Sequence, residues 1–312
     1  MKNKSDVNIS VFTETPHGRR NEQNADSLEG IKDKLGDKSF LEYIKRKQKN
    51  TAFKAETGLP DNWRGKTVIE FGCGAGMKIL PFALKGANVI GIDGSSVQIE
   101  RIKKNAENLK VKGEFILSKL EEIDINKLPK ADLIICSAVI HHVHEWSNVL
   151  QKICETTDAN GYIYLTWGDW TIHLSGFNLK NQIAYRLGWN NKSRLFIGML
   201  LFGWWDKNRN KQNIEKKSFF ADLYSAYYIL LSYKKIKNEL KKNGIQVMNA
   251  IPPNNLSQFI QTYELAGKNS KILKIFKNIN NSPFSFLGTI IIKLRYYFQP
   301  KHGPRIISAK KI

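Results

Sequence analysis

Cysteine is scarce in this sequence of 312 residues. Only Cys73, Cys136 and Cys154 occur, and no two of them form a C-x-x-C motif. Three cysteines cannot all pair, so the sequence argues against a disulfide framework and favours a reducing compartment. The same spacing argues against a zinc site, and we expect no bound metal.

Long apolar runs are also missing. No run reaches the roughly 18–20 residues that a membrane-spanning helix needs. The first ten residues, MKNKSDVNIS, lack the apolar region of a secretory signal, so we expect a cytoplasmic protein. The apolar segments 195–205 and 287–298 are long enough to lie in a membrane interface, although both could equally belong to the core. A peripheral position at the inner face of the membrane therefore stays open.

Acidic residues become rare after residue 165. Residues 1–165 hold 25 Lys and Arg against 22 Asp and Glu, whereas residues 166–312 hold 24 against 6, a net charge of +18. A basic half favours a partner that carries phosphates, such as a nucleic acid or an anionic membrane. Compositional bias is the competing explanation, because Lys outnumbers Arg 39 to 10. Such bias explains the excess of Lys but not the loss of acidic residues.

Apolar segments of strand length alternate with amphipathic helices in the first half of the chain. Strands are expected at 66–71, 87–93, 113–118, 131–138 and 161–167, with helices at 77–86, 95–110 and 147–157. This alternation predicts an α/β fold with a doubly wound, mostly parallel, seven-stranded sheet. Ligands of such sheets bind beyond the carboxyl ends of the strands. The loops after residues 71, 93, 118 and 137 should therefore surround one pocket.

The alternation stops at residue 168 and resumes at residue 232. We expect five parts: a polar, helical lid region at 1–62, an α/β core at 63–167, a helical aromatic insertion at 168–231, the completion of the core at 232–298, and a loose basic tail at 299–312. The completion should contain a helix at 232–244, a strand at 245–251, a broken helix at 256–279 and a last strand at 287–298.

A glycine-rich turn, EFGCGAG at 70–76, follows the first expected strand. Glycines at alternate positions let the backbone turn tightly and let a ligand approach it closely. Met77 stands where a dinucleotide fingerprint would carry its third Gly or Ala. Asp93, at the end of the second strand, can accept both ribose hydroxyls of a nucleoside. Alternatively, the turn binds nothing and Asp93 caps the next helix, although capping and ribose binding could coexist.

These motifs resemble those of the class I S-adenosylmethionine-dependent methyltransferases. The similar segments are VIEFGCGAG at 68–76, VIGIDGS at 89–95, DLIICSAVIHHV at 132–143 and LQKICETTDANGYIYLT at 150–166. The resemblance covers residues 64–166, with a weaker similarity at 232–251. It is closest to the small-molecule and lipid type, which carries a His-His pair after the fourth strand.

The resemblance implies that S-adenosylmethionine is the cofactor. Its methionine portion would lie against the glycine turn, with Glu70 near the amino group and Asp93 on the ribose. The cofactor-binding residues would be Glu70, Gly72, Cys73, Gly74, Gly76, Asp93, Gly94 and Ser137. Lys119 departs from the family pattern, since an acidic residue usually stands there near the adenine amine. Either Glu121 substitutes for it, or backbone and apolar contacts alone hold the adenine.

Methyl transfer from a sulfonium is an in-line displacement that depends on holding donor and acceptor in near-attack geometry. A hydroxyl acceptor also needs a base, and His141 and His142 follow the fourth strand at the rim of the expected pocket. His142 is the preferred base. Alternatively, one ring packs under the sheet and the other caps the helix near Glu145. Asp169, after the fifth strand, could orient the acceptor or could be an ordinary loop acid.

Four further residues are expected to contact the acceptor: Arg19, Trp170, His173 and Tyr224. Each could instead be a solvated or core side chain. Absent motifs narrow the acceptor class. The fourth strand is not followed by an N/D-P-P-Y/F/W sequence or by Pro-Cys, and no acidic metal cluster of the catechol type is present. Exocyclic base amines, cytosine C5 and metal-bound catechols therefore lose support as acceptors.

The sequence thus predicts O- or C-methylation of a small metabolite, a sugar or a lipid-linked acceptor that carries an anionic group. An RNA methyltransferase that uses the basic half to bind phosphates is the first alternative. The second alternative is a non-catalytic module that binds a membrane or a partner on a methyltransferase fold.

Overall fold

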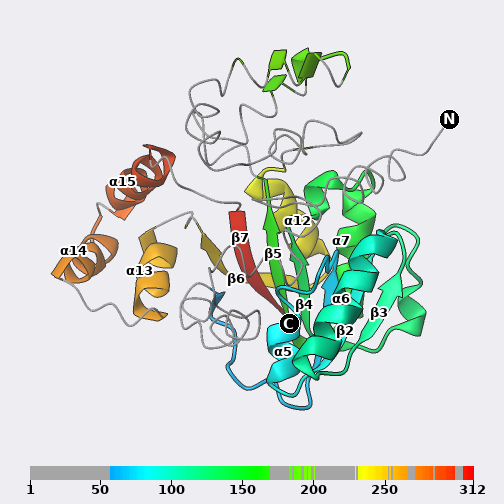
Figure 1. The fold of residues 1–312 in the computed structure, drawn as a ribbon. Helices are drawn as coiled ribbons and strands as arrows, with labels where there is room; N and C mark the ends of the chain where they lie inside the picture. The colour runs from blue at the N-terminus through cyan, green and yellow to red at the C-terminus, as the bar shows by residue number, and fades with distance from the viewer. Residues whose placement is uncertain are drawn as a thin grey trace, which may run out of the picture.

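The computed structural model describes residues 57–168, 183–184, 186–190, 193–194, 196–197, 200, 229, 231–251, 253, 256–265, 271–283, 285–298 and 305–312. Its strands form one seven-stranded sheet in the order β3-β2-β1-β4-β5-β7-β6 (Figure 1). Strands β1 to β5 are parallel, whereas β7 runs antiparallel to both of its neighbours. The predicted α/β fold with a mostly parallel, seven-stranded sheet is confirmed.

The elements lie close to the predicted ranges in the first half of the chain. The strands are β1 (Thr67–Phe71), β2 (Asn88–Asp93), β3 (Glu114–Leu117), β4 (Ala131–Ser137), β5 (Thr157–Trp167), β6 (Ile245–Ile251) and β7 (Arg305–Lys311). The helices are α5 (Leu80–Leu84), α6 (Ser96–Leu109), α7 (Trp146–Thr156), α12 (Tyr233–Lys242), α13 (Leu256–Leu265), α14 (Lys271–Asn280) and α15 (Ser285–Phe298). Two short 3₁₀ helices, η2 (Ile125–Lys127) and η3 (Ile140–His142), flank β4.

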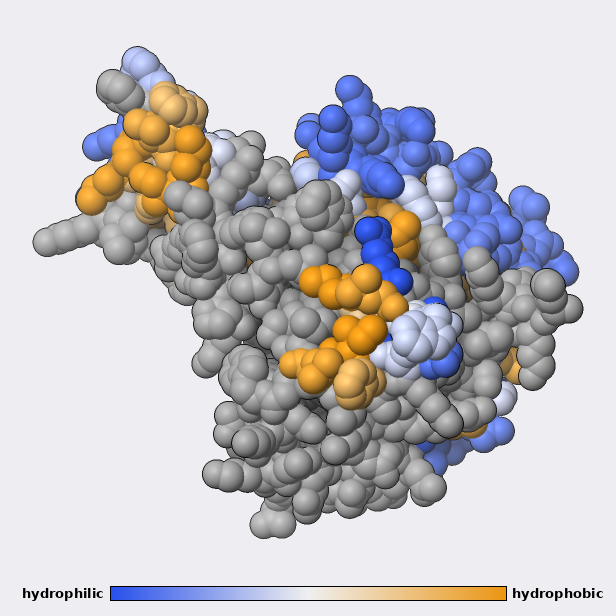
Figure 2. All heavy atoms as spheres, turned by 90° about the horizontal axis from the view of Figure 1, so that it is seen from above, coloured by the Kyte–Doolittle hydropathy of each residue, from blue (hydrophilic) through white to orange (hydrophobic). Residues whose placement is uncertain are grey.

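The prediction of the last strand was wrong. Residues 287–298 belong to helix α15, and the seventh strand is β7, inside the segment predicted as a loose basic tail. A short apolar run rich in Ile and aromatic residues cannot be assigned to strand or helix by periodicity alone. In α15 this run packs Ile292 into a small cluster with α13 and α14, and leaves other apolar side chains exposed at one end of the molecule (Figure 2).

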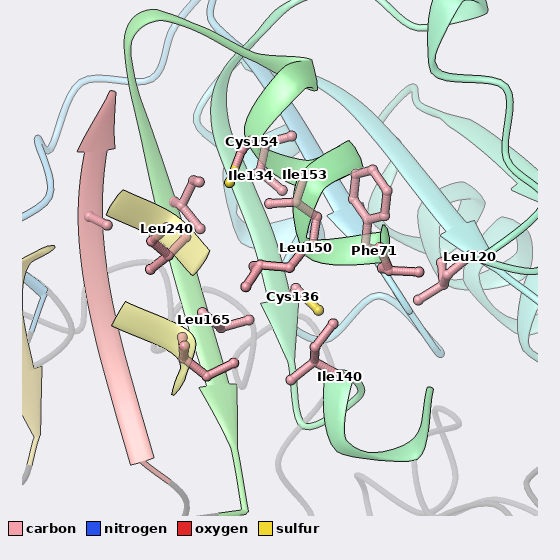
Figure 3. Close-up of a cluster of buried hydrophobic side chains, with 14 of the residues drawn as sticks. Phe71, Leu120, Ile134, Cys136, Ile140, Leu150, Ile153, Cys154, Leu165 and Leu240 are labelled. Carbon is pink, nitrogen blue, oxygen red and sulfur yellow. The ribbon is translucent and has the colours of Figure 1, made fainter. Parts of the chain in front are cut away.

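The main core lies on both faces of the sheet. Alternate residues of β4 point to opposite sides: Leu133 and Ile135 pack with α5 and α6, whereas Ile134 and Cys136 pack with α7 and α12. Figure 3 shows the second side, where Phe71, Leu150 and Leu240 come together from a strand and two helices. Because both faces are covered, the strands read as nearly continuous apolar runs. Among the described residues, no helix is long and apolar enough to cross a bilayer.

Candidate active site

The glycine turn lies at the carboxyl ends of β1 and β2, and its three glycines have different surroundings. Gly72, Gly74 and Gly76 all have positive φ, at 75°, 49° and 86°. A Cβ on Gly72 would approach Val139 Cγ2 to 2.4 Å, and one on Gly76 would approach Ile102 Cγ1 to 2.7 Å, whereas one on Gly74 would meet no atom within 4 Å. Packing therefore requires glycine at 72 and 76. Gly74 faces open space, where a ligand can approach the backbone.

Asp93 ties this turn to the end of β2. Its Oδ2 accepts the backbone N–H of Gly74 at 2.9 Å, and its Oδ1 accepts that of Ser95 at 2.9 Å. Burial raises the pKa of this carboxyl, and the two backbone hydrogen bonds lower it. A carboxylate oxygen has two acceptor positions, so each oxygen keeps one position for a ligand hydroxyl. The helix cap is Ser95, whose Oγ accepts the N–H of Gln98.

Glu70 is buried beside the turn and is only 3% exposed. Among the described residues, its Oε2 has no hydrogen-bond partner. The pKa of Glu70 is raised to about 8, chiefly by burial and also by Asp93, against the lowering effects of Lys78 and of the backbone N–H of Ile79. A buried carboxylate without a full set of partners is costly, so a ligand cation or N–H donor at Oε2 would stabilise its charged form. This orphaned oxygen fits the amino group of S-adenosylmethionine.

The side chain of Cys73 packs inward. It is buried, and a Cβ on Gly91 of β2 would lie 2.9 Å from its Sγ. Burial also raises the pKa of the Cys73 thiol well above its usual range, which keeps it neutral. The side chain of Cys73 is thus not available to a ligand. Its backbone N–H donates to the carbonyl of Ile92, and its carbonyl accepts the N–H of Gly76.

The ends of β4 and β5 are linked by hydroxyl groups. Ser137 Oγ lies 2.9 Å from Thr166 Oγ1, which also accepts the backbone N–H of Ala138 at 2.9 Å. Ala138 has φ of 60°, a conformation that costs energy for a residue with a Cβ and is concentrated at functional sites. Neither Ala138 nor Thr166 was predicted as a site residue, because Ala and Thr do not by themselves mark a catalytic or binding motif.

Another missed residue supports the glycine turn from helix α6. Asn105 is buried, and its Nδ2 donates to the carbonyl of Ala75 at 2.9 Å. A polar residue at a buried position of α6 was the available signal. Asn105 holds the turn at Ala75, and Asp93 holds it at Gly74.

Both histidines lie in η3 directly after β4, where each is less than a tenth exposed and their ring centroids are 4.3 Å apart. The Nδ1 atom of His141 lies 3.4 Å from the backbone N of Gly168, which donates to it. The carbonyl of His141 accepts the N–H of Ile229 at 2.9 Å. His141 is therefore held by the chain after β5, and its Nδ1 serves as an acceptor. The ring of the predicted base, His142, lies against the His141 ring at an angle of 43°.

The insertion after β5 leaves and rejoins the sheet at one place. Trp167 Nε1 donates to the carbonyl of Leu231 at 2.7 Å, and the N–H of Leu231 donates to the carbonyl of Gly168 at 3.2 Å. With the contact between Ile229 and His141, these bonds bring both ends of the insertion next to the histidine pair. We refer to Trp167, Gly168, Ile229 and Leu231 as the insertion clasp.

Several predicted site residues lie outside the described part of the chain: Arg19, Asp169, Trp170, His173 and Tyr224. Gly94 lies between Asp93 and the capping residue Ser95, and is partly buried. Lys119, which replaces the expected acid, forms an ion pair with Glu122 at 2.9 Å. Glu121 follows it in the same partly buried turn. Within the described ranges, no group of three His, Cys, Asp or Glu side chains is placed to hold a metal.

Comparisons with known sequences point to one domain family. A family model described as "Methyltransferase domain" matches residues 63–197. A ubiquinone biosynthesis O-methyltransferase from Rickettsia akari (strain Hartford) is 28% identical over 141 residues, 45% of this chain and 49% of that protein. The mitochondrial protein of the same name from Homo sapiens is 29% identical over 127 residues, 40% of this chain and 32% of that protein. The chain thus spans half or less of the length of these relatives.

Comparisons with solved structures support the fold. PKMT2 from Rickettsia typhi superimposes with a TM-score of 0.54 at 16% identity, covering 85% of this chain and 52% of that one. Magnesium protoporphyrin IX methyltransferase from Synechocystis PCC 6803, solved with bound SAM, gives a TM-score of 0.50 at 14% identity over 100% of this chain and 99% of that one. At these identities, the likeness concerns the fold alone.

Proposed function

Residues 63–197 belong to the class I S-adenosylmethionine-dependent methyltransferases, and on that premise we propose that the chain transfers a methyl group to a small metabolite, a sugar or a lipid-linked acceptor. The single observation that carries the proposal is the arrangement around Asp93. This partly buried carboxylate holds the backbone of Gly74, the one glycine of the turn with an open Cβ position, at the carboxyl edge of a parallel sheet. A nucleoside ligand needs both features, an acceptor for its ribose hydroxyls and a backbone that it can approach.

The residues of the turn would divide the cofactor between them. Gly72, Gly74 and Gly76 would lie along the methionine portion, Glu70 would receive its amino group, and Asp93 would accept the ribose hydroxyls. Gly94, Ser137 and the backbone of Cys73 would complete the contacts. When bound, S-adenosylmethionine supplies an electrophilic methyl group on a sulfonium. The chain's own contribution is to hold that group in line with the acceptor and to exclude water.

The histidine pair would handle the acceptor proton. In this proposal His142 removes the proton from a hydroxyl or an acidic carbon, and His141 keeps the neighbouring ring in position. The bond from Gly168 to His141 Nδ1 supports the second role, because a ring whose acceptor nitrogen is occupied is a poor base at that atom. Asp169 would orient the acceptor, and Arg19, Trp170, His173 and Tyr224 would contact it.

The proposed acceptor class rests on the relatives and on charge. The similar proteins from Rickettsia akari and Homo sapiens carry the name ubiquinone biosynthesis O-methyltransferase, which supports O-methylation of a lipid-linked substrate. The net charge of +18 over residues 166–312 favours an acceptor with an anionic group. The insertion clasp supports residues 168–231 as the part that selects the acceptor, with residues 1–62 as a lid. Contact with a membrane surface would bring a lipid-linked acceptor to the carboxyl edge of the sheet.

The experiment uses methyl-labelled S-adenosylmethionine with the purified protein and an extract of the source cells. Asp93→Ala provides the blank, and the products are separated into organic-soluble, small aqueous and nucleic-acid fractions. We expect label in the organic-soluble or small aqueous fraction. Label in nuclease-sensitive material would contradict the acceptor class and favour RNA. A folded protein that fails to bind the cofactor in calorimetry would contradict methyl transfer itself.

A further inference from the structure

Helices α13, α14 and α15 form a small unit inserted between β6 and β7 (Figure 1). The unit has its own apolar cluster, separate from the two clusters that cover the sheet. Leu256, Phe259, Leu273 and Ile292 are its fully buried members, and the rings of Phe259 and Phe276 meet edge to face at 5.2 Å. A unit with its own cluster can present a surface without disturbing the sheet.

Helix α15 is apolar on both of its faces. The inner face packs closely, because a Cβ on Gly288 would approach Leu256 Cδ2 to 2.6 Å, and Ile292 is fully buried. The outer face carries Phe286, Leu287, Ile290 and Ile291, which are 43–58% exposed. These four positions fall on one stripe of a helix. Exposed apolar side chains gathered on one stripe mark a surface that binds something.

Helix α14 extends the exposed stripe and adds positive charge. Ile275 is 57% exposed, and its neighbour Lys274 is exposed as well. We call Ile275, Phe286, Leu287, Ile290 and Ile291 the α14–α15 surface. The sequence around it is strongly basic, since residues 265–312 contain ten Lys and Arg and no Asp or Glu, although Glu264 of α13 forms an ion pair with Lys277 of α14. Apolar and basic side chains together match a layer that offers both anionic groups and hydrocarbon.

A second exposed apolar group faces the same side of the molecule. Leu187, Trp189, Phe196 and Leu200 are 61–84% exposed and belong to the segment that follows β5. Figure 2 shows this group near the centre of the view and the α14–α15 surface at the upper left. The second group contains Trp189, and Trp is favoured where an apolar layer meets water.

We propose that the α14–α15 surface docks on an anionic lipid bilayer. The apolar stripe enters the boundary between headgroups and acyl chains, and the exposed Lys274 contacts the anionic headgroups. The contact is peripheral, because the helices of the unit are 10, 10 and 14 residues long, too short to span. The inference does not depend on methyl transfer, and its test measures binding rather than activity.

The experiment is sedimentation of the purified full-length chain with vesicles of phosphatidylcholine, with and without about 30% phosphatidylglycerol. We expect binding to the anionic vesicles only, and a loss of binding at about 0.5 M salt, where charges are screened within a few ångströms. The double variant Ile290→Gln/Ile291→Gln should weaken binding by about tenfold or more, because it removes apolar area from the interface. Lys274→Glu should also weaken it.

Matched controls come from the opposite edge of the sheet. Leu117 on β3 is 57% exposed, like Ile275, so Leu117→Gln should leave vesicle binding unchanged. Lys103 on α6 is exposed, like Lys274, so Lys103→Glu should also leave vesicle binding unchanged. An equal loss of vesicle binding in a variant and in its control would overturn the assignment of the α14–α15 surface. Circular dichroism and cofactor calorimetry on each variant separate loss of docking from loss of the fold or of the proposed methyl-transfer site.

Two other outcomes would also overturn the proposal. Equal binding to neutral and anionic vesicles would remove the role of the basic side chains. A dimer in sedimentation velocity without vesicles, abolished by Ile290→Gln/Ile291→Gln, would mean that a second copy of the chain covers the surface. A monomer that binds anionic vesicles supports the bilayer as the occupant.

Discussion

Two regions of this molecule reverse the usual distribution of polar and apolar groups, in opposite directions. Around β1 and β2, carboxyl groups that normally face water are withdrawn from it: Glu70 is buried and Asp93 is partly buried. In the unit of α13 to α15, apolar side chains that are normally buried face water. Buried polar groups and exposed apolar patches are the informative exceptions to ordinary burial. The first region is suited to a small polar ligand, the second to an extended apolar layer.

The two regions also differ in what fixes their geometry. Backbone hydrogen bonds and the packing of two glycines hold the turn after β1, so its ligand groups are pre-set. The α14–α15 surface consists of side chains alone, which can be exchanged without disturbing buried contacts. Substitutions should therefore affect cofactor binding, catalysis or stability in the first region and only surface binding in the second.

The largest expected effect concerns the histidine pair. His142→Ala should lower the methyl-transfer rate by about 10²–10⁴, the usual contribution of a general base. His144→Ala is the control, because His144 is exposed two residues further on. Single-turnover rates at saturating cofactor measure the effect. A fall of less than about threefold would remove His142 as the base.

The next largest effect is on stability, and it compares a glycine whose Cβ position is filled by a neighbouring side chain with glycines whose Cβ position is open. Gly72→Ala should destabilise the fold by about 2–3 kcal/mol, from the cost of positive φ and the contact with Val139. Gly65→Ala should cost about 1 kcal/mol, since Gly65 has φ of 71° but an open Cβ position. Gly74→Ala should resemble Gly65→Ala in urea unfolding and yet lose cofactor affinity. If Gly74→Ala retains its affinity for the cofactor, the cofactor does not lie against Gly74.

Asp93→Ala should weaken cofactor binding by at least tenfold, which corresponds to about 1.4 kcal/mol. The change removes the acceptor for ribose hydroxyls and the two backbone bonds to Gly74 and Ser95. Calorimetry measures the affinity, and circular dichroism confirms that the variant is folded. An unchanged affinity in a folded variant excludes the ribose assignment.

Glu70 should make stability depend on pH. Its pKa is raised from 4.5 to about 8 in the folded chain, so between these values the folded state holds one more proton than the unfolded state. Stability should therefore fall as pH rises through this window, by about 1.4 kcal/mol per pH unit at most. Glu70→Gln should flatten the profile in urea unfolding between pH 5 and 8. An identical slope in both proteins would show that another group is responsible.

The smallest expected effect is the stability change at the exposed surface. Ile290→Gln/Ile291→Gln should alter the free energy of unfolding by no more than about 0.5 kcal/mol, because both side chains are about half exposed. Thermal unfolding measures it. A large destabilisation would mean that these residues are covered within the chain, and the contrast between the two regions would then disappear.

The sequence was sufficient for the first region and not for the second. The glycine turn, Asp93 and β1 to β5 follow from local signals, since each strand is an apolar run bounded by turn residues. The last strand was predicted at 287–298, which lies in helix α15, because an Ile-rich run suits both states. Strand β7 lies in the segment predicted as a loose tail, because its pairing with β5 joins residues far apart in the chain. The roles of Asn105, Ala138 and Thr166 likewise arise from contacts between distant elements, which a single sequence does not display.

The position of β7 has a consequence for the synthesis of the chain. In the described sheet, β6 contacts the other strands only through β7, which lies between β5 and β6. Yet β6 is translated before β7, with the whole unit of α13 to α15 between them. On the ribosome, β6 must therefore wait as an unpaired strand until β7 emerges. A nascent chain paused before residue 305 would expose this strand and the free edge of β5, and chaperones that recognise unpaired edges would find it in that interval.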